Sequence, residues 1–180
     1  MTWSRLARRI RVPLGFAFAI VYVVLAQPTP LSIAVGVMIA LGGLAVRAAA
    51  SGHISKNSEL TTSGPYAYTR NPLYLGSIVI AAGFAIAARS WIVVAVLLAL
   101  FLAIYLPVIH SEEEFLRSRF PEFAAYARQV PRLWPKFGPY SSSVGSFSRQ
   151  RYLQHREYNA LIGSAVMIAA LVAKLLWAGR

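Results

Sequence analysis

The chain contains no cysteine and no aspartate, and only 13% of its 180 residues are charged. The lack of cysteine excludes disulfides, thiolate zinc sites and cysteine nucleophiles. The lack of aspartate excludes a Ser-His-Asp triad. No Gly-x-Gly occurs, so neither a Rossmann nor a P-loop nucleotide site is available. The three histidines lie far apart without metal-ligand spacing, and we expect no metal site.

What the chain has in excess is apolar residues, at 57%, and positive charge, at +12. Such a composition is typical of a membrane protein rather than a soluble domain. The basic residues flank apolar runs, where they set orientation and meet anionic lipid, so a membrane is favoured over nucleic acid as the partner. Because no convincing cleavage site follows the basic N-terminus, we interpret the first apolar run as a retained helix.

Five apolar segments approach the roughly 20 residues that a membrane span needs. Arg89-Ser90 predicts a tight turn, so the helices on either side of it should be antiparallel neighbours. We therefore predict an all-α, polytopic membrane bundle of about five transmembrane helices, with short cytoplasmic helices forming a cofactor pocket in one domain, 1–180. The predicted spans are 12–26, 31–50, 73–88, 91–109 and 158–178.

Charge predicts the orientation and the loops. With five spans, fifteen of the 18 Lys and Arg residues fall on the side of the N-terminus, as do all six glutamates. This asymmetry predicts a cytoplasmic N-terminus. The fourth helix should continue past the membrane to Arg119, and Pro121 should open a short helix ending near Val130. Residues 141–146 are predicted to form a linker, and Arg47 and Lys174 to lie at helix ends.

The first polar cluster lies at the start of the third predicted helix. Asn71-Pro72 predicts an N-cap followed by the first helical residue. Free backbone N–H groups and the helix dipole favour an anion at such a position, and Arg70 adds a fixed positive charge. A membrane anchor and a simple cap would explain the same residues.

The second polar cluster follows the fourth helix. Glu112, Glu113 and Glu114 stand where the helix dipole disfavours negative charge, which indicates a cationic partner, either a ligand ammonium or Arg117 and Arg119. Aromatic residues gather at the same interface, where an aromatic belt is common but where rings also pack on adenine or contact a sulfonium. They are Tyr66, Tyr68, Tyr74, Tyr126 and Trp134.

In order along 50–136, these residues resemble the isoprenylcysteine carboxyl methyltransferase and phospholipid methyltransferase group of membrane enzymes. Asn71 stands where that group has a histidine, which argues against a proton-accepting role there. Phe120-Pro121 replaces Phe-Gly, and Phe123 replaces the first of two tyrosines. Within this resemblance, these departures suggest a bacterial branch, and so an inner membrane. The matching residues are Gly64-Pro65-Tyr66, Arg70-Asn71-Pro72-Leu73-Tyr74-Leu75-Gly76, Glu112-Glu113-Glu114-Phe115-Leu116, Tyr126, Val130-Pro131-Arg132 and Pro135.

The resemblance implies that S-adenosylmethionine binds on the cytoplasmic side. Its carboxylate would meet Arg70 and Asn71, and its ammonium Glu112 or Glu113. The other implied cofactor-binding residues are Tyr66, Pro72, Tyr74, Tyr126, Pro131 and Pro135.

The implied methyl acceptor is a lipid-like or prenylated molecule of the isoprenylcysteine carboxylate type, entering from the bilayer. A carboxylate acceptor needs only a cation to hold it, and Arg132 or Arg156 is the candidate. An amine acceptor must lose a proton, and Glu113 or His110 would then be the base. The C-terminal helix, about 155–178, lies outside the resemblance.

Three other readings stay open. The chain could methylate phospholipid amines. It could be a non-catalytic membrane protein, such as a transport or assembly subunit, that retains the fold. It could be a sterol-reductase-type enzyme using NADPH, although the short chain and the five predicted spans argue against that. The methyl acceptor and the oligomeric state are left open.

Overall fold

The computed structural model describes residue 15 and residues 17–54, 59–140 and 145–178. All regular secondary structure within these ranges is helical and none is strand, which confirms the predicted all-α class. Two of the elements are not α-helices: η1 is a 3₁₀-helix and η2 a π-helical segment. The elements are α2 (Pro30–His53), η1 (Gly64–Ala67), α3 (Pro72–Ala88), α4 (Trp91–Leu100), η2 (Phe101–Tyr105), α5 (Leu106–Arg119), α6 (Phe123–Gln129), α7 (Arg149–Gln154) and α8 (Tyr158–Ala178).

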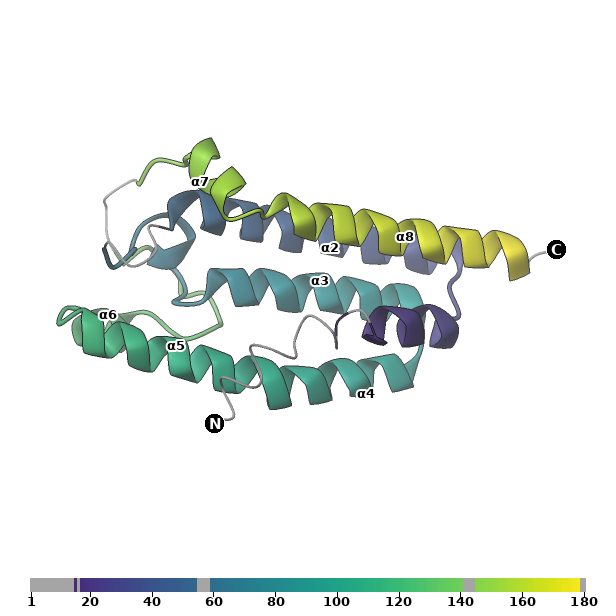
Figure 1. Cartoon of the computed structure of the whole chain (residues 1–180), viewed down its shortest axis with the longest axis horizontal. Coiled ribbons are helices and arrows are strands. Elements are labelled where there is room, and N and C mark those ends of the chain that lie inside the picture. The colour runs from purple at the N-terminus through teal and green to yellow at the C-terminus, as the bar shows by residue number, and fades with distance from the viewer. Residues whose placement is uncertain (1–14, 16, 55–58, 141–144, 179–180) are drawn as a thin grey trace.

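Three of the described helices are long and apolar enough to cross a membrane: α2, the continuous helix Trp91–Arg119, and α8. The apolar α3 is shorter, at 17 residues. Their axes run roughly side by side along the longest dimension of the molecule (Figure 1). Of the predicted span 12–26, residues 17–25 are helical, while 12–14 and 16 lie outside the described residues. The structure is thus an all-α membrane bundle.

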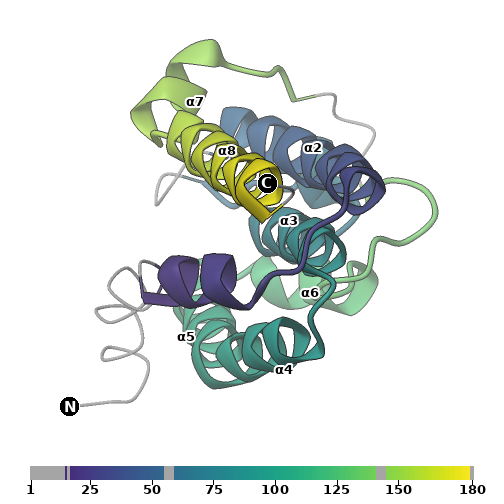
Figure 2. The ribbon, with the colours of Figure 1, turned by 90° about the vertical axis from the view of Figure 1, so that its right-hand side faces the viewer.

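The pair α2 and α3 forms the centre of the bundle through glycines. A methyl group added at Gly36 would lie 2.4 Å from the carbonyl oxygen of Gly83, and one at Gly43 would lie 2.6 Å from that of Gly76. Small residues let membrane helices approach this closely, because no side chain separates the backbones. Viewed end-on, α3 lies between α2 and the α4–α5 helix (Figure 2).

The fourth helix is longer than the predicted span and contains a widened turn. It runs to Arg119, as predicted, but η2 interrupts it with a bond from the Leu106 N–H to the Phe101 carbonyl. Pro107 follows at once, and a proline ring collides with the carbonyl four residues earlier in a regular α-helix. A π turn relieves that crowding. The span 91–109 was predicted as one uninterrupted helix, so this turn was not predicted.

The short elements η1, α6 and α7 gather at one end of the bundle, called the polar end below (left in Figure 1). One prediction here was wrong: Pro121 and Glu122 form a turn, and α6 begins at Phe123 instead. A small core formed by Phe120, Phe123, Tyr126 and Val130 fixes α6. Of the predicted linker 141–146, residues 141–144 lie outside the described residues, as do the N-terminal arginines.

At the opposite end, turns and a lysine join the helices. Arg89 ends α3 in the left-handed conformation, with φ 50°, which produces the predicted turn into α4. Lys174 of α8 donates to the carbonyls of Val23 and Val24, at 2.7 Å each. These carbonyls belong to the last turn of the first helix, where orphan acceptors need donors. Lys174 therefore ties the first helix to the last.

Candidate active site

Backbone hydrogen bonds join two segments sixty residues apart at the polar end. The N–H of Arg70 donates to the carbonyl of Pro131 at 2.9 Å, and the N–H of Lys136 donates to that of Tyr68 at 3.0 Å. The proline-rich segment after α6 is thereby fixed beside the start of α3. This juxtaposition brings together the two polar clusters found in the sequence.

Glu113 lies at the centre of the combined cluster, with its side chain 8% exposed. Its Oε1 accepts from Asn71 Nδ2 at 3.0 Å and lies 3.6 Å from Arg70 Nε. Its Oε2 accepts from Arg132, at 3.0 Å from Nε and 2.8 Å from Nη2. Hydrogen bonds to ionised partners are among the stronger ones in proteins. One carboxylate therefore pairs with two guanidinium groups and an amide from two separate segments.

Asn71 occupies the predicted N-cap position, and Pro72 is the first residue of α3. Its side chain, however, makes no capping hydrogen bond. It donates to Glu113 and, at 3.0 Å, to the carbonyl of Arg132. The first-turn N–H groups of α3 therefore have no side-chain cap from Asn71, and such groups favour anions.

A hydrogen bond links two of the predicted tyrosines, Tyr66 and Tyr126. The Tyr126 hydroxyl donates to the Tyr66 carbonyl at 2.7 Å. Burial raises the pKa of the Tyr126 phenol; Arg70 opposes this rise, and Glu113 adds to it. Burial also raises the pKa of the Tyr66 phenol, and the charges of Glu112 and Glu157 raise it further. The Tyr66 hydroxyl oxygen is buried and has no hydrogen-bond partner within the described part of the chain.

The structure distinguishes the three consecutive glutamates. Glu113 points into the cluster, whereas Glu114 is exposed and lies 3.2 Å from His110 on the same face of α5. Glu112 is half-buried, and its charge acts on the Tyr66 phenol. Which glutamate faces the cluster depends on how α5 is rotated about its axis, which the sequence did not determine. In the structure each of the three carboxylates has a different environment.

The remaining predicted site residues lie at different distances from the cluster. Pro72 is fully buried, Pro131 is half-buried and Pro135 is exposed. Arg156 is exposed in the turn between α7 and α8, with a left-handed φ of 52°. In both ribbon views this turn and α5 lie on opposite sides of α3 (Figures 1 and 2). Arg156 is therefore not brought to Glu113.

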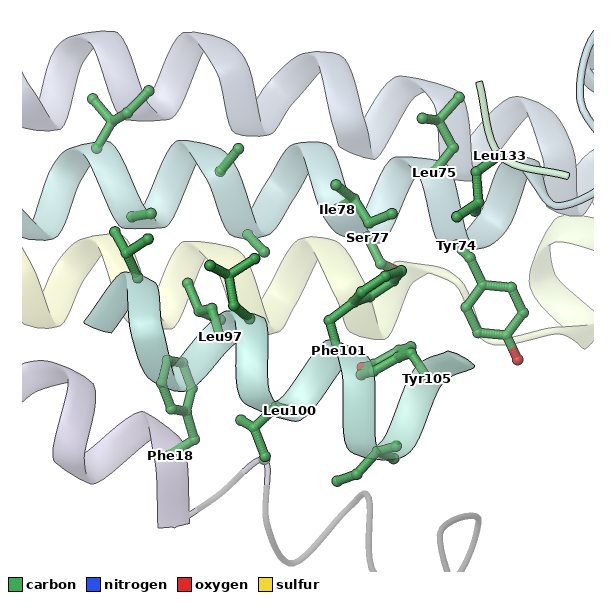
Figure 3. Close-up of a pocket in the computed structure, with 18 of the residues that line it drawn as sticks. Phe18, Tyr74, Leu75, Ser77, Ile78, Leu97, Leu100, Phe101, Tyr105 and Leu133 are labelled. Atoms are coloured by element: carbon green, nitrogen blue, oxygen red, sulfur yellow. The ribbon is translucent and has the colours of Figure 1, made fainter. Parts of the chain in front are cut away.

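A cavity of about 660 Å³ opens between α3 and the α4–η2 helix. Tyr74, Tyr105 and Leu133 line the end nearer the polar end (Figure 3). Tyr74 and Tyr105 meet there edge to face, with ring centroids 5.9 Å apart. Most of the lining is apolar. The other residues that line the cavity are these two tyrosines, Ser77, Gly15 and Trp134. An apolar cavity therefore lies beside the charged cluster.

A second ion pair lies at the polar end and was not predicted from the sequence. Arg47 of α2 holds both carboxylate oxygens of Glu157, at 2.8 to 3.0 Å. Its remaining nitrogen donates to the Leu73 carbonyl and to Ser77 Oγ on α3. The signal in the sequence was a charge inside an apolar span, which usually has a specific partner. The sequence does not say which partner that is.

Fold and site together define an integral membrane protein of helices, with a charged cluster at one end and an apolar cavity running from it. The phospholipid methyltransferase family model matches residues 30–122, just over half of the chain. The chain belongs to the phospholipid methyltransferase family, as the sequence resemblance predicted.

Two curated proteins are similar to part of the chain. One is the cobalt-zinc-cadmium resistance protein CzcN of Cupriavidus metallidurans, 41% identical over 100 residues, which are 52% of this chain and 46% of that protein. The other is the nickel-cobalt-cadmium resistance protein NccN of Alcaligenes xylosoxydans xylosoxydans, 38% identical over 52% of this chain and 47% of that protein. The match thus spans about half the length of these relatives. No solved structure matches the chain.

Proposed function

We propose that the protein transfers a methyl group from S-adenosylmethionine to a lipid-like or prenylated acceptor of the isoprenylcysteine carboxylate type. The reaction takes place at the cytoplasmic face of a bacterial inner membrane, in one domain whose cofactor-binding core is about 50–136. The observation that carries the proposal is the charged cluster around Glu113, which lies beside a membrane-level apolar cavity. Because the chain belongs to the phospholipid methyltransferase family, this juxtaposition supports methyl transfer to a lipid-like acceptor.

The residues at the polar end fit such a cofactor. S-adenosylmethionine carries a carboxylate, an ammonium and a sulfonium, and when bound it supplies an electrophilic methyl group. Arg70 Nε and the Tyr66 hydroxyl are buried without hydrogen-bond partners among the described residues, so both have donor capacity. Arg70 and the uncapped start of α3 would hold the carboxylate. The half-buried Glu112 would hold the ammonium.

Glu113 receives a different role from the one its sequence position first suggested. Both of its oxygens are already engaged by Asn71 and Arg132, with Arg70 close by. A carboxylate whose two oxygens are already paired with an amide and a guanidinium group has no oxygen left to accept a proton from an acceptor. We assign Glu113 to holding Arg70 and Arg132 in position rather than to removing a proton.

The acceptor would lie with its apolar part in the cavity and its reacting group at the Tyr74 end. Arg132, whose side chain is 45% exposed, would hold an acceptor carboxylate there. The turn that carries Arg156 lies across α3 from α5, so Arg156 is not assigned this role. A carboxylate needs no general base, so alignment of the two reactants supplies most of the acceleration. The apolar walls exclude water from the reacting atoms.

Calorimetry with S-adenosylhomocysteine on the detergent-purified protein tests this proposal. We expect saturable binding that Arg70→Ala weakens at least tenfold. The matched control is Arg128→Ala, which removes an exposed guanidinium from α6 and should leave binding unchanged. Absence of binding by helical wild-type protein, or equal losses in both variants, would contradict the cofactor assignment. Screening carboxylate and amine lipids then separates this acceptor from phospholipid amines.

The names of the two relatives favour a second candidate, a non-catalytic membrane component of metal resistance. A metal-tolerance assay in cells separates the two. If an Arg70→Ala variant that no longer binds S-adenosylhomocysteine still supports full tolerance, the non-catalytic role stands. If tolerance is lost together with cofactor binding, methyl transfer is the better account.

A further inference from the structure

The cavity has the shape of a groove along α3. Its lining on this helix runs from Tyr74 to Ile86, twelve residues apart, which corresponds to about 18 Å of helix. Along its length α3 contributes small side chains, among them Ala81 and Ala85, opposite the bulkier residues of α4 and η2. The small side chains of α3 therefore leave space opposite Leu97, Leu100 and Phe101, which line the other wall (Figure 3).

Length and volume give two measures of what the groove can hold. An extended hydrocarbon advances roughly 1.25 Å per carbon, given a C–C bond of about 1.5 Å, so about 14 carbons fit end to end. A methylene group takes about as much space as a liquid water molecule, ~30 Å³, so 660 Å³ holds about 22 of them. One tail of about 14 carbons satisfies both measures, whereas two such tails exceed the volume.

Charge indicates the head group. The cluster at the Tyr74 end combines Arg70 and Arg132 with the single carboxylate of Glu113 and is net positive. Arg132 immediately precedes Leu133, which lines the groove. An anionic head at this end would meet a guanidinium, while its tail lies between α3 and α4.

We infer that the groove binds an amphiphile with one hydrocarbon tail and an anionic head, and that Ala81 and Ala85 determine the tail length it accepts. The inference rests on the proposed function only in taking this amphiphile as the methyl acceptor. By helical rise, Ala81 lies about 10 Å from Tyr74 and Ala85 about 16 Å. A large side chain at either position should therefore shorten the groove to a different length.

The test uses competition by saturated fatty acids of about 8 to 16 carbons against a fluorescent fatty acid, on protein in detergent. The ratio of variant to wild-type affinity at each length cancels the partition of the tail into the micelle. Ala85→Phe should leave the shortest tails within twofold and weaken the longest at least tenfold. Ala81→Phe should weaken tails of every length above about eight carbons. The control is Ala99→Phe, the same change at an exposed position of α4 outside the lining, which should leave all ratios near one.

Ratios for Ala85→Phe that do not depend on length, whether near one or uniformly low, would overturn the inference. Retained short-tail binding shows that this variant is folded, and Ala85→Leu repeats the test with a smaller change. Wild-type protein whose groove binds no fatty acid of any length would also overturn it. Calorimetry with S-adenosylhomocysteine on the same samples keeps the two proposals apart. Length-dependent tail binding without cofactor binding would refute the proposed methyl transfer and support the groove inference. Cofactor binding without length-dependent tail binding would refute only the groove inference.

Discussion

Glu113 and Glu157 both bind arginine at the polar end, yet their surroundings differ in charge and in saturation. Glu157 holds one guanidinium through both oxygens, and that guanidinium donates its remaining hydrogens to α3, so the pair is neutral and complete. Glu113 is shared between Arg70 and Arg132, which leaves one net positive charge. Arg70 Nε stays 3.6 Å away, beyond hydrogen-bond length.

The two clusters therefore differ in what they can bind. A saturated, neutral pair that joins α8 to α2 and α3 has no donor left for a ligand, so its contribution is to packing. A cluster with surplus charge, and with a donor that has no hydrogen-bond partner among the described residues, would be completed by an anion. The predictions below separate a structural pair from a binding cluster by measuring stability and affinity on the same variants.

The largest effect on stability is expected from Arg47→Met. It leaves the Glu157 carboxylate, 12% exposed, without its partner. Breaking a buried pair costs about 3–5 kcal/mol; because this pair is partly exposed, we expect a loss of about 2–4 kcal/mol in the free energy of unfolding. The measurement is equilibrium unfolding in mixed micelles.

The double variant Arg47→Met with Glu157→Leu is the control, because it removes both charges. It should recover most of the lost stability, and S-adenosylhomocysteine affinity of the folded protein should stay within twofold of wild type. A large loss of affinity at unchanged stability would instead make the Arg47–Glu157 pair part of the binding site.

The opposite pattern is expected for Glu113→Gln. The neutral side chain keeps an acceptor for Asn71 but no longer neutralises Arg70 and Arg132, which then repel each other. We expect S-adenosylhomocysteine affinity to fall about tenfold, or ~1.4 kcal/mol, by calorimetry. The free energy of unfolding should change by less than the free energy of binding does, since Arg132 is half exposed. Glu114→Gln, at the exposed neighbouring position, should change neither; equal losses in both variants would refute the assignment.

Much of the fold follows from local signals, and the particular pairings do not. Asn71-Pro72 and Arg89-Ser90 punctuate the chain, so the predicted span 73–88 differs from α3 by one residue. The fourth helix was placed but not its π turn, because composition marks 91–109 only as one apolar run. Local chemistry thus defines the helix ends, whereas the interior adjusts to neighbours that a single segment does not reveal.

The membership of the charged cluster was predictable, and its geometry was not. Consecutive glutamates lie about 100° apart around a helix, so only packing decides that Glu113 is the one turned inward. Glu157 lies 110 residues from Arg47 in the chain, and nothing local links them. The cavity depends on which alanines of α3 face which side chains of α4, a property of the assembled pair.

A smaller change in affinity is expected from Glu112→Gln, which tests the ammonium partner. A charge-assisted hydrogen bond contributes about 1.5–3 kcal/mol when buried, and for this half-buried carboxylate we expect about 1 kcal/mol, a roughly fivefold loss. The loss should be seen with S-adenosylhomocysteine and should vanish with methylthioadenosine, which lacks the amino-acid moiety. Equal losses for both ligands would mean that Glu112 acts on the whole site rather than on the ammonium.

The smallest effect is expected from Tyr126→Phe, which removes the hydrogen bond to the Tyr66 carbonyl and the support it gives to η1. We expect a loss of about 0.5–1 kcal/mol at neutral pH. The pKa of this buried phenol is raised in the folded protein, so the folded state retains the proton more strongly than the unfolded chain. Its contribution is therefore complete below a pH of about 10 and is lost as pH rises further, toward the folded-state pKa. Unfolding curves on either side of that pH should show wild-type stability falling more steeply than that of Tyr126→Phe. Parallel curves would place the alkaline loss in other groups, the buried Tyr66 phenol first among them.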